Sequence, residues 1–470
     1  MADSASPNPT DVAPQCDRLL RQIWAALGGN AALPASVGFT GEGDLPSVFA
    51  VSDLASGVVA AAGLAVAELI AARGGAAPAV QVDRRLASFW FGTTLRPLGW
   101  SVPPPWDPIA GDYAAADGWI RLHTNAPHHR DAALAVLQAP ADKDAVAAAV
   151  SRWQKDELEA AVVQHGGCAA AMRDLASWSA HPHGRAVASE PLAWIDDGDV
   201  ATRAEWRAAG DRPLAGIRVL DLTRVLAGPV ATRFLAGFGA DVLRIDPPGW
   251  DEPGVIPSVT LGKRCARLDL RQPDERGVFE HLLASADVLV HGYRPNALGR
   301  LGLDTATRRR LRPGLVDVSL DAYGWTGAWQ ARRGFDSLVQ MSSGIAGEGM
   351  RRYGTDRPKP MPVQALDHAT GYLMAAAVVR GLTRRRTEGK GSITRTSLAR
   401  TAALLTSAPI AERNEAFAQE GTADFTDAIE QTSWGPARRM KPPVVVEGAA
   451  MRWDLPASAL GSSRPVWLAR

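Results

Sequence analysis

Strand-like and helix-like segments alternate along the chain from Pro213 onward, and this alternation constrains the fold more than any other feature. Apolar runs typical of strands occur at 217–222, 241–245, 287–291 and 315–320. Segments with helical spacing lie between them, at 229–238 and 274–284. Strands separated by helices form parallel βαβ units. We therefore predict an α/β fold: a doubly wound, Rossmann-like parallel sheet domain with a smaller α+β domain.

Composition excludes several classes of protein. The 470 residues include 51 Lys and Arg against 50 Asp and Glu, which gives a net charge of +1. Such a balance provides no global field for nucleic acid or membrane, so any anion site must be local. Cys16, Cys168 and Cys265 lie far apart and form no CxxC pair. We therefore expect neither a disulfide framework nor a metal site.

The N-terminal segment and the longest apolar run bear on location. Residues 1–14 have no basic start and no apolar core, so they do not resemble a secretory signal. The run 57–67 is too short to span a bilayer and ends at Glu68. We interpret it as a buried helix and expect a cytoplasmic protein without membrane or nucleic-acid partners.

Two aspartates open apolar, helix-like stretches in similar surroundings. Asp367 lies in the segment 363–371, and the apolar stretch 372–382 follows it. Asp53 lies in the segment 52–57 and precedes the apolar run described above. A short carboxylate in this position is commonly a helix N-cap, which accepts hydrogen bonds from backbone N–H groups. The local pattern alone favours the capping role for both residues.

Four further blocks carry a family resemblance. They lie at 213–223, at 227–242, at 290–302 and at 387–391. The first three precede Asp367 and the fourth follows it, which is the expected order. Together with Asp367 they resemble family III CoA-transferases, the family of formyl-CoA and carnitine CoA-transferases. The resemblance implies that Asp367 is the nucleophile, and it reverses the preference for a simple cap at that residue. For Asp53, the structural cap remains the favoured interpretation.

The blocks stand in an unusual order, which suggests partial duplication and permutation. In the family the sheet comes first, and a linker, a small domain and a C-terminal return follow the nucleophile. Here we predict a disordered N-terminus, a partial duplicate of the nucleophile-helix segment, a linker with the small domain, the CoA-transferase domain and the C-terminal return. The predicted bounds are 1–17, 18–96, 97–190, 213–400 and 401–470.

The resemblance also implies a reaction and its reactants. A carboxylate attacks a thioester to form a mixed anhydride, and the CoA thiolate then converts the anhydride to an aspartyl-CoA thioester. An incoming carboxylic acid takes over the CoA. The expected substrates are acyl-CoA and carboxylic acids, with coenzyme A as the carried group and no metal. Family members form interlocked dimers, so the resemblance implies a homodimer.

By motif position, the family's CoA-contacting residues fall on several side chains and loops of this sequence. The first group precedes the helix at 229–238, whose N-terminus suits an anion. The carried-over residues are Arg224, Val225, Leu226, Ala227, Leu268, Arg271, Gly292, Tyr293 and Arg300.

Departures from the family pattern leave the substrate and two alternatives open. Formyl-CoA transferases have Gln where this chain has Leu226, and their Gly-rich loop has no clear match here. A racemase of the same fold uses a Gly-His-Asp motif, but this chain has Gly334, Phe335 and Asp336, and Phe335 cannot move protons. The alternatives are such a racemase or isomerase, and a non-catalytic CoA-binding relative.

The remaining histidines lack the spacing of metal ligands. We interpret His128, His129, His181 and His183 as loop-surface residues, because no carboxylate partners stand near them in the sequence.

Overall fold

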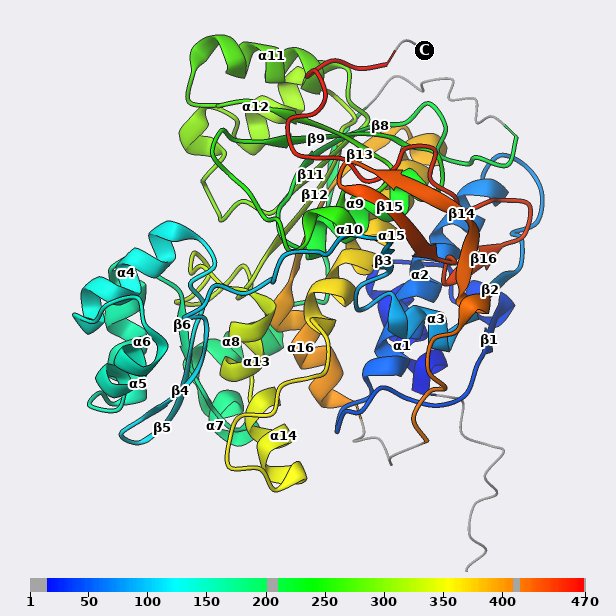
Figure 1. Cartoon of the computed structure of the whole chain (residues 1–470). Coiled ribbons are helices and arrows are strands. Elements are labelled where there is room, and N and C mark those ends of the chain that lie inside the picture. Colours follow the sequence, from blue (N-terminus) through cyan, green and yellow to red (C-terminus); the bar gives the residue numbers. More distant parts are fainter. Residues whose placement is uncertain (1–14, 201–209, 409–414, 469–470) are drawn as a thin grey trace, which may run out of the picture.

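A seven-stranded sheet organises the larger part of the molecule (Figure 1). The computed structural model describes residues 15–200, 210–408 and 415–468. Its strand order is β10-β9-β8-β11-β12-β13-β7, and all pairs are parallel except β13 with β7. Counted along the chain from β8, the parallel strands run 3-2-1-4-5-6, the order of doubly wound nucleotide-binding sheets. The predicted fold class is confirmed. The strands are β7 (Trp194–Val200), β8 (Arg218–Leu222), β9 (Asp241–Asp246), β10 (Lys263–Arg267), β11 (Val288–His291), β12 (Val316–Asp321) and β13 (Lys390–Ser397).

Helices cover both faces of this sheet, because each strand buries side chains on both sides. On one face, Val219 and Val242 belong to the core that includes α9 (Ala227–Gly237) and α15 (Ala365–Glu388). On the other face, Leu220 and Leu243 pack with Phe279 of α11 (Pro273–Ala284). Alternating inward residues on two buried faces are expected of parallel sheets covered by crossover helices. The further helices of this part are α10 (Ile256–Val259), α12 (Thr305–Leu311), α13 (Asp336–Ser342), α14 (Ile345–Tyr353) and α16 (Leu398–Ser407).

A smaller α+β unit projects from the side of the large sheet (Figure 1, cyan). Its antiparallel sheet has the order β4-β5-β6, and its own core includes Ile120, Leu122 and Val162. The elements are β4 (Gly111–Ala115), β5 (Gly118–Leu122), α4 (Pro127–Leu137), α5 (Lys143–Val150), α6 (Lys155–Gln164), β6 (Ala169–Ala171), α7 (Leu175–Ala180) and α8 (Pro182–Ser189).

The two ends of the chain meet in two further sheets. Figure 1 shows the blue N-terminal segments beside the orange and red C-terminal ones. Strand β16 pairs with β2, and β15 pairs with β3. Both pairings join residues before 100 to residues after 430. The elements are α1 (Gln15–Ala26), β1 (Val37–Thr40), α2 (Val51–Ala71), β2 (Val80–Asp83), α3 (Arg84–Phe89), β3 (Leu95–Pro97), β14 (Phe425–Thr432), β15 (Gly435–Met440) and β16 (Val444–Val446).

Helices α2 and α15 pack together and begin in the same way. Asp53 is the third residue of α2, and Asp367 is the third residue of α15. Neither is an N-cap: those positions belong to Ala50 and Gln364, so the capping interpretation is wrong for both aspartates. Each aspartate is followed one turn later by a glycine against which another helix packs closely. A Cβ on Gly371 would lie 2.4 Å from the carbonyl oxygen of Ala227.

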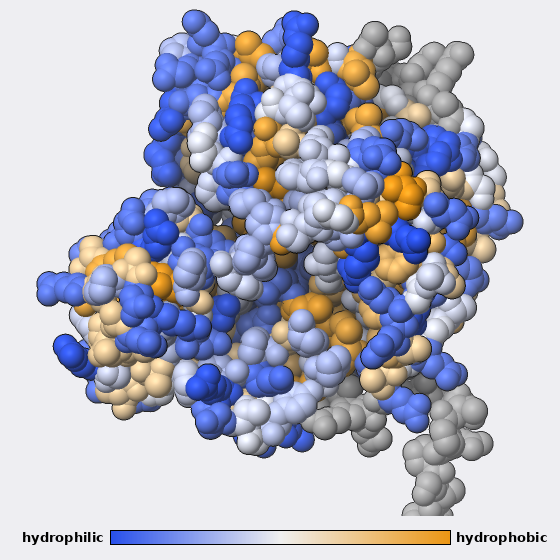
Figure 2. Space-filling view, in the orientation of Figure 1, coloured by the Kyte–Doolittle hydropathy of each residue, from blue (hydrophilic) through white to orange (hydrophobic). Residues whose placement is uncertain are grey.

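The apolar segment of α2 is longer than the sequence run suggested. The helix spans 21 residues and is, among the described residues, the one helix long and apolar enough to cross a membrane. In this structure, 83% of its apolar window is buried inside the protein. The helix is therefore a buried core helix, and its length alone would not have indicated this. The molecular face in Figure 2 is mostly hydrophilic, with apolar residues in separate groups rather than one continuous band.

Three local expectations differ from the structure. Helix α1 starts at Gln15, inside the segment expected to be disordered, while residues 1–14 lie outside the described part. Strand β7 joins the large sheet, although its residues lie between the bounds predicted for the small domain and for the CoA-transferase domain. His129 and His183 are 4% and 1% exposed and lie in helices, so the loop-surface interpretation is wrong for them.

We expect Gly371→Ala to destabilise the protein by about 1–3 kcal/mol, the range typical of overpacking a dense core. The added methyl group would meet the backbone of α9, which cannot move aside as a flexible side chain could. Gly277→Ala is the matched control, because nothing lies within 4 Å of the added atom in α11. There we expect no loss, or a gain of up to about 1 kcal/mol from helix propensity. Equal denaturation midpoints for both variants would contradict the close packing of α9 on α15.

Candidate active site

A cavity lies where the strand order of the large sheet reverses. Strands β8 and β11 are neighbours at this point, and the chain continues from them in opposite directions across the sheet. The loops that follow the two strands therefore form a crevice, which is where doubly wound sheets bind ligands. The cavity has a volume of about 420 Å³. Of the residues predicted from the sequence, it gathers six: Arg224, Val225, Ala227, Gly292, Tyr293 and Asp367.

The loop after β8 is held in an unusual backbone conformation. Val225 has φ of 63°, a left-handed value that a β-branched residue rarely adopts. Its N–H donates to Oε1 of Glu252 at 2.7 Å. Arg244 in turn donates to both Glu252 and Asp246. Arg244 and Asp246 are fully buried. Strained residues held by surrounding contacts cluster at functional sites.

Arg224, the residue before Val225 in this loop, lies between two aromatic rings. Its guanidinium stands 4.6 Å from the ring centre of Trp250 and 5.5 Å from that of Tyr293. One nitrogen also donates to the Tyr293 hydroxyl at 3.3 Å. No ion pair between Arg224 and a carboxylate occurs within the described residues. A cation without an acidic partner, flanked by aromatic rings, suits an anion that also carries an apolar or aromatic part.

Asp367 lies at the base of the cavity, and a second carboxyl group lies beside it. Asp336 Oδ2 accepts hydrogen bonds from the N–H groups of Leu366 at 2.8 Å and of Asp367 at 3.1 Å. Asp336 thereby caps α15 from a neighbouring helix, since Gln364 provides no side-chain cap. Gln340 donates to the other oxygen of Asp336.

The surroundings of the two carboxyl groups shift their pKa values by different amounts. Burial, and after it the charge of Asp336, raises the pKa of Asp367 well above its usual range. Burial also raises the pKa of Asp336 to about 6, but the hydrogen bonds that it accepts favour its charged form. Like charges at this spacing disfavour double ionisation. Of the two carboxyl groups, Asp336 therefore favours the charged form more strongly, and Asp367 the protonated form.

A second cavity reaches Asp367 from the other side. It has a volume of about 540 Å³ and includes Leu226, the remaining predicted residue of the first loop. Phe335 borders both cavities, so it forms part of the wall between them. His368 lines the second cavity and stacks on Phe91 at 5.3 Å, and burial lowers its pKa to about 3. Asp367 thus borders two chambers, which allows two reactants to approach it.

Three predicted residues lie elsewhere. Leu268 is 5% exposed and belongs to the core on the opposite side of the sheet. The side chain of Arg271 is 75% exposed and pairs with Asp269. Arg300 is exposed and borders neither of the two cavities that meet at Asp367. A role for these three in CoA binding stays a prediction.

Sequence reasoning missed other residues of the first cavity. His129 comes from the small domain, Arg294 from the loop after β11, and Arg333 from the segment before α13. Arg294 stands inside a recognised motif block, directly after Tyr293, and could have been selected there. No local pattern identifies His129 or Arg333, because their place in the site depends on how the small domain packs against the sheet.

Asp53 occupies a different electrostatic environment. Arg84 donates to its Oδ1 at 2.9 Å and also pairs with Asp44. The carboxyl group borders neither cavity that meets at Asp367. A carboxylate engaged by a partly buried guanidinium is a poor nucleophile, because attack would require loss of the ion pair.

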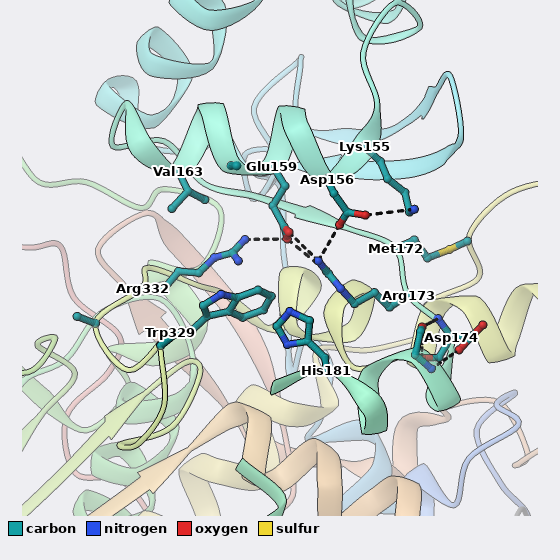
Figure 3. A pocket seen from close by; sticks show the side chains of 14 residues that line it. Lys155, Asp156, Glu159, Val163, Met172, Arg173, Asp174, His181, Trp329 and Arg332 are labelled. Carbon is teal, nitrogen blue, oxygen red and sulfur yellow. Dashed lines mark hydrogen bonds and ion pairs between the residues drawn. The ribbon is translucent and has the colours of Figure 1, made fainter. Parts of the chain in front are cut away.

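A larger pocket of about 980 Å³ lies between the small domain and the loop before α13 (Figure 3). Glu159 binds Arg173 and Arg332 there, each at 2.8 Å. Trp329 lies against Arg332, with the guanidinium 4.1 Å from the ring centre. These charged groups satisfy one another, and Asp367 does not border this pocket. Among the described residues, no group of His, Cys, Asp or Glu has the arrangement of a metal site.

Comparison with known proteins supports the motif-based recognition. Residues 214–432 match the family model described as CoA-transferase family III. Succinyl-CoA:glutarate CoA-transferase of Mus musculus is 33% identical over 195 residues, covering 38% of this chain and 44% of that protein. Succinate–glutarate CoA-transferase of Agrobacterium fabrum is 32% identical over 200 residues, covering 38% and 49%.

A crystal structure of a Mycobacterium tuberculosis protein matches 42% of this chain and 57% of its own, with 29% identity and a TM-score of 0.38. The chain spans less than half of the length of the two curated relatives named above. The matched segment nevertheless contains Asp367, Asp336 and the loops after β8 and β11. Residues 214–432 are thus similar to CoA-transferase family III, as the sequence motifs indicated.

Proposed function

We propose that the protein transfers CoA between carboxylic acids, with Asp367 as the nucleophile. One observation carries the proposal: Asp367 lies at the junction of two cavities, one of which is formed by the loops at the reversal of strand order. The two named relatives are called CoA-transferases, and this agrees with the proposal.

The first half of the reaction loads CoA onto the protein. Asp367 loses its proton, and its carboxylate oxygen attacks the thioester carbonyl carbon of the donor. The carbon–sulfur bond breaks, which leaves a mixed anhydride and the CoA thiolate. The thiolate then attacks the Asp367 carbonyl carbon of the anhydride. The carbon–oxygen bond to the donor breaks, so the donor leaves as a carboxylate and Asp367 holds CoA as a thioester.

The second half runs the same steps with the acceptor. The acceptor carboxylate attacks the aspartyl thioester and releases the thiolate, which then attacks the acceptor side of the new anhydride. Acceptor-CoA leaves, and the Asp367 carboxylate is restored. Water must be kept from both acyl intermediates, and the 7% exposure of Asp367 serves this requirement.

The charge on Asp336 has a further role in this scheme. It raises the pKa of Asp367, so the carboxylate, once formed, is a stronger nucleophile than an exposed aspartate. Both carboxyl groups keep fixed positions, because the backbone N–H groups of α15 bind Asp336.

Racemisation on this fold is the second candidate, since two imidazoles lie against Phe335. His123 stacks on Phe335 at 3.6 Å, and His129 meets its edge at 5.9 Å. Burial lowers the pKa of both histidines to about 3, which makes them weak bases near neutral pH. Transfer is therefore the better supported function. Exchange of the α-hydrogen of an acyl-CoA with deuterium in solvent would favour racemisation instead.

We expect Asp367→Asn to lower CoA transfer by roughly three to six orders of magnitude, as loss of a covalent nucleophile does. Mass spectrometry of the wild type, incubated with a panel of acyl-CoAs, should find CoA attached to the peptide containing Asp367. Asp53→Asn is the matched control, and its activity should stay within about threefold of the wild type. Full activity in Asp367→Asn with loss in Asp53→Asn would assign the nucleophile to the other helix.

We expect Asp336→Asn to move the acid limb of the pH–rate profile to lower pH. The pKa of Asp367 is raised, so its reactive carboxylate forms only as the pH rises through that pKa. Removing the negative charge of Asp336 lowers the pKa of Asp367, while the Asn oxygen can still accept the two backbone hydrogen bonds. The profile of kcat/KM measures this shift. An unchanged limb would show that Asp336 does not control ionisation of the nucleophile.

Arg224→Met should weaken CoA binding by roughly ten- to a hundredfold, since hydrogen bonds to charged groups contribute about 1.5–3 kcal/mol. Calorimetric titration with CoA measures the effect. Arg309→Met removes an equal charge that pairs with Asp199 away from the cavity, and serves as the control. The same titration tests Arg271→Met and Arg300→Met, and unchanged affinity in both would remove those residues from the CoA site.

A further inference from the structure

A second carboxyl group lines the first cavity and takes no part in the transfer steps described above. Asp321 is the last residue of β12, and the carboxyl end of this strand lies beside that of β11 at the reversal of strand order. Asp321 and Asp367 both border the cavity of about 420 Å³. Asp321 is 7% exposed, so its carboxyl group is largely shielded from solvent.

The two oxygens of the Asp321 carboxyl group have different surroundings. Oδ1 accepts a hydrogen bond from the N–H of Gly324 at 2.7 Å. Oδ2 is buried and has no hydrogen-bond partner among the described residues. Buried polar atoms without partners are rare in folded proteins and call for a ligand or a functional reason. Because Asp321 forms part of the cavity wall, a ligand in the cavity can supply the partner that Oδ2 lacks.

Glu190 lies against the turn that follows Asp321, since a Cβ on Gly324 would stand 2.9 Å from Oε1 of Glu190. That oxygen accepts hydrogen bonds from the N–H groups of Trp325 at 2.8 Å and Thr326 at 2.7 Å, and from the Thr326 hydroxyl at 2.7 Å. An ionised carboxylate is suited to accept several such bonds. Burial, and with it the charge of Glu190, raises the pKa of Asp321 well above its usual range. Asp321 therefore favours the protonated form, in which Oδ2 carries an O–H donor.

The other ionisable groups around Asp321 do not bind it. Arg400 of α16 donates to the backbone carbonyl oxygen of Glu190. The remaining ionisable groups of the cavity wall are His128, His129, Arg224, Tyr293, Arg294, Arg332, Arg333 and Asp367. None of them forms a hydrogen bond or an ion pair with Asp321 in the part of the chain that the structure describes. Asp321 thus offers the cavity a hydrogen-bond donor rather than a paired charge.

We propose that Asp321 is a catalytic residue, whose Oδ2–H donates a hydrogen bond to the thioester carbonyl oxygen of the acyl-CoA while Asp367 attacks the carbonyl carbon. This inference rests on the transfer reaction proposed above. Attack turns the carbonyl oxygen into an oxyanion, and a fixed donor in a water-poor site stabilises that charge. The proton stays on Asp321 throughout. When the carbon–sulfur bond breaks, the carbonyl group forms again and the hydrogen bond weakens.

The amide carbonyl groups in the pantetheine arm of CoA offer the same kind of acceptor. Free CoA carries these amides but no thioester, so its affinity reports on the amides alone. An amide contact is also equally strong before and during attack, and such a contact changes binding rather than the rate of the chemical step. A hydrogen bond to the thioester should therefore affect the rate of attack and leave the affinity for free CoA.

We expect Asp321→Leu to slow the loading of CoA onto Asp367 by roughly a hundred- to a thousandfold, the loss typical of an oxyanion donor. Single-turnover mass spectrometry with the most reactive acyl-CoA of the panel measures this rate. Affinity for free CoA should stay within about threefold. Asp321→Asn keeps a donor and an acceptor for the Gly324 N–H, so it should load CoA roughly tenfold or more faster than Asp321→Leu. Asp241→Asn is the matched control, because Asp241 begins β9 at the opposite edge of the sheet and pairs with Arg264.

The pH–rate profile gives a readout that a purely structural role would not move. The pKa of Asp321 is raised and its protonated form is the donor, so the rate should fall as the pH rises through that pKa. This basic limb should be absent in Asp321→Asn, because an amide does not ionise, while the acid limb set by Asp367 stays. A basic limb that is missing from the wild type, or that persists in Asp321→Asn, overturns the proposal.

An infrared measurement tests the hydrogen bond without any transfer. In Asp367→Asn, the carbonyl stretch of acetyl-CoA with an isotope-labelled thioester should move to lower frequency on binding, and adding Asp321→Leu should remove most of this shift. Thermal melts confirm that each variant is folded. A shift that Asp321→Leu leaves unchanged overturns the proposal.

Two further outcomes separate this proposal from its alternatives. Weaker binding of free CoA by Asp321→Leu, with an unchanged loading rate, overturns the proposal and assigns Asp321 to the pantetheine amides. An infrared shift that depends on Asp321, without a CoA adduct at Asp367 in the wild type, would reject the nucleophile but keep the hydrogen bond to the thioester.

Discussion

The hydrogen bonds from the N–H groups of Leu366 and Asp367 to the Asp336 carboxylate hold the site together. They satisfy the buried start of α15, which would otherwise leave donors without partners. They also fix Asp367 between two cavities and keep the negative charge on Asp336. Burial and the charge of Asp336 raise the pKa of Asp367, and a carboxylate with a raised pKa is a stronger nucleophile once it ionises. Helix capping, nucleophile position and nucleophile pKa therefore depend on one interaction, and none of them can change alone.

Helix α2 begins like α15, but its aspartate has a different partner. Asp53 stands at the same helical position as Asp367 and precedes a glycine by one turn, so the local motif cannot separate the two residues. What separates them is the partner: Arg84 neutralises Asp53, while a second carboxylate opposes Asp367. Burial raises the pKa of both carboxyl groups, but the Arg84 ion pair counteracts the rise at Asp53, whereas the charge of Asp336 adds to it at Asp367. The distinction between scaffold and reactive group lies in contacts from other elements, beyond the reach of local sequence.

This limit explains what the sequence could predict. The βαβ pattern, its strands and the loops at the reversal of strand order follow from local periodicity and turn positions, and they bring Arg224, Gly292 and Tyr293 together. Strand β7 was missed because its acidic sequence reads as a loop. Its backbone nevertheless pairs with β13, and Lys390 and Arg395 of that strand form ion pairs with Asp197 and Asp196. His129 and Arg333 were missed for the same kind of reason, since only packing between domains brings them to the cavity.

The two halves of the chain complete each other's sheets with edge strands. Strand β7 follows the small domain yet completes the sheet of β13, and β16 ends the chain yet pairs with β2. Each half thus covers an edge that the other would leave open, with α2 packed on α15 between them. The homodimer that the resemblance implies stays a prediction. The helix that bears Asp367 packs on α2, and α2 packs in turn on β2 and β16, so the surroundings of the site include contacts between the two ends of the chain.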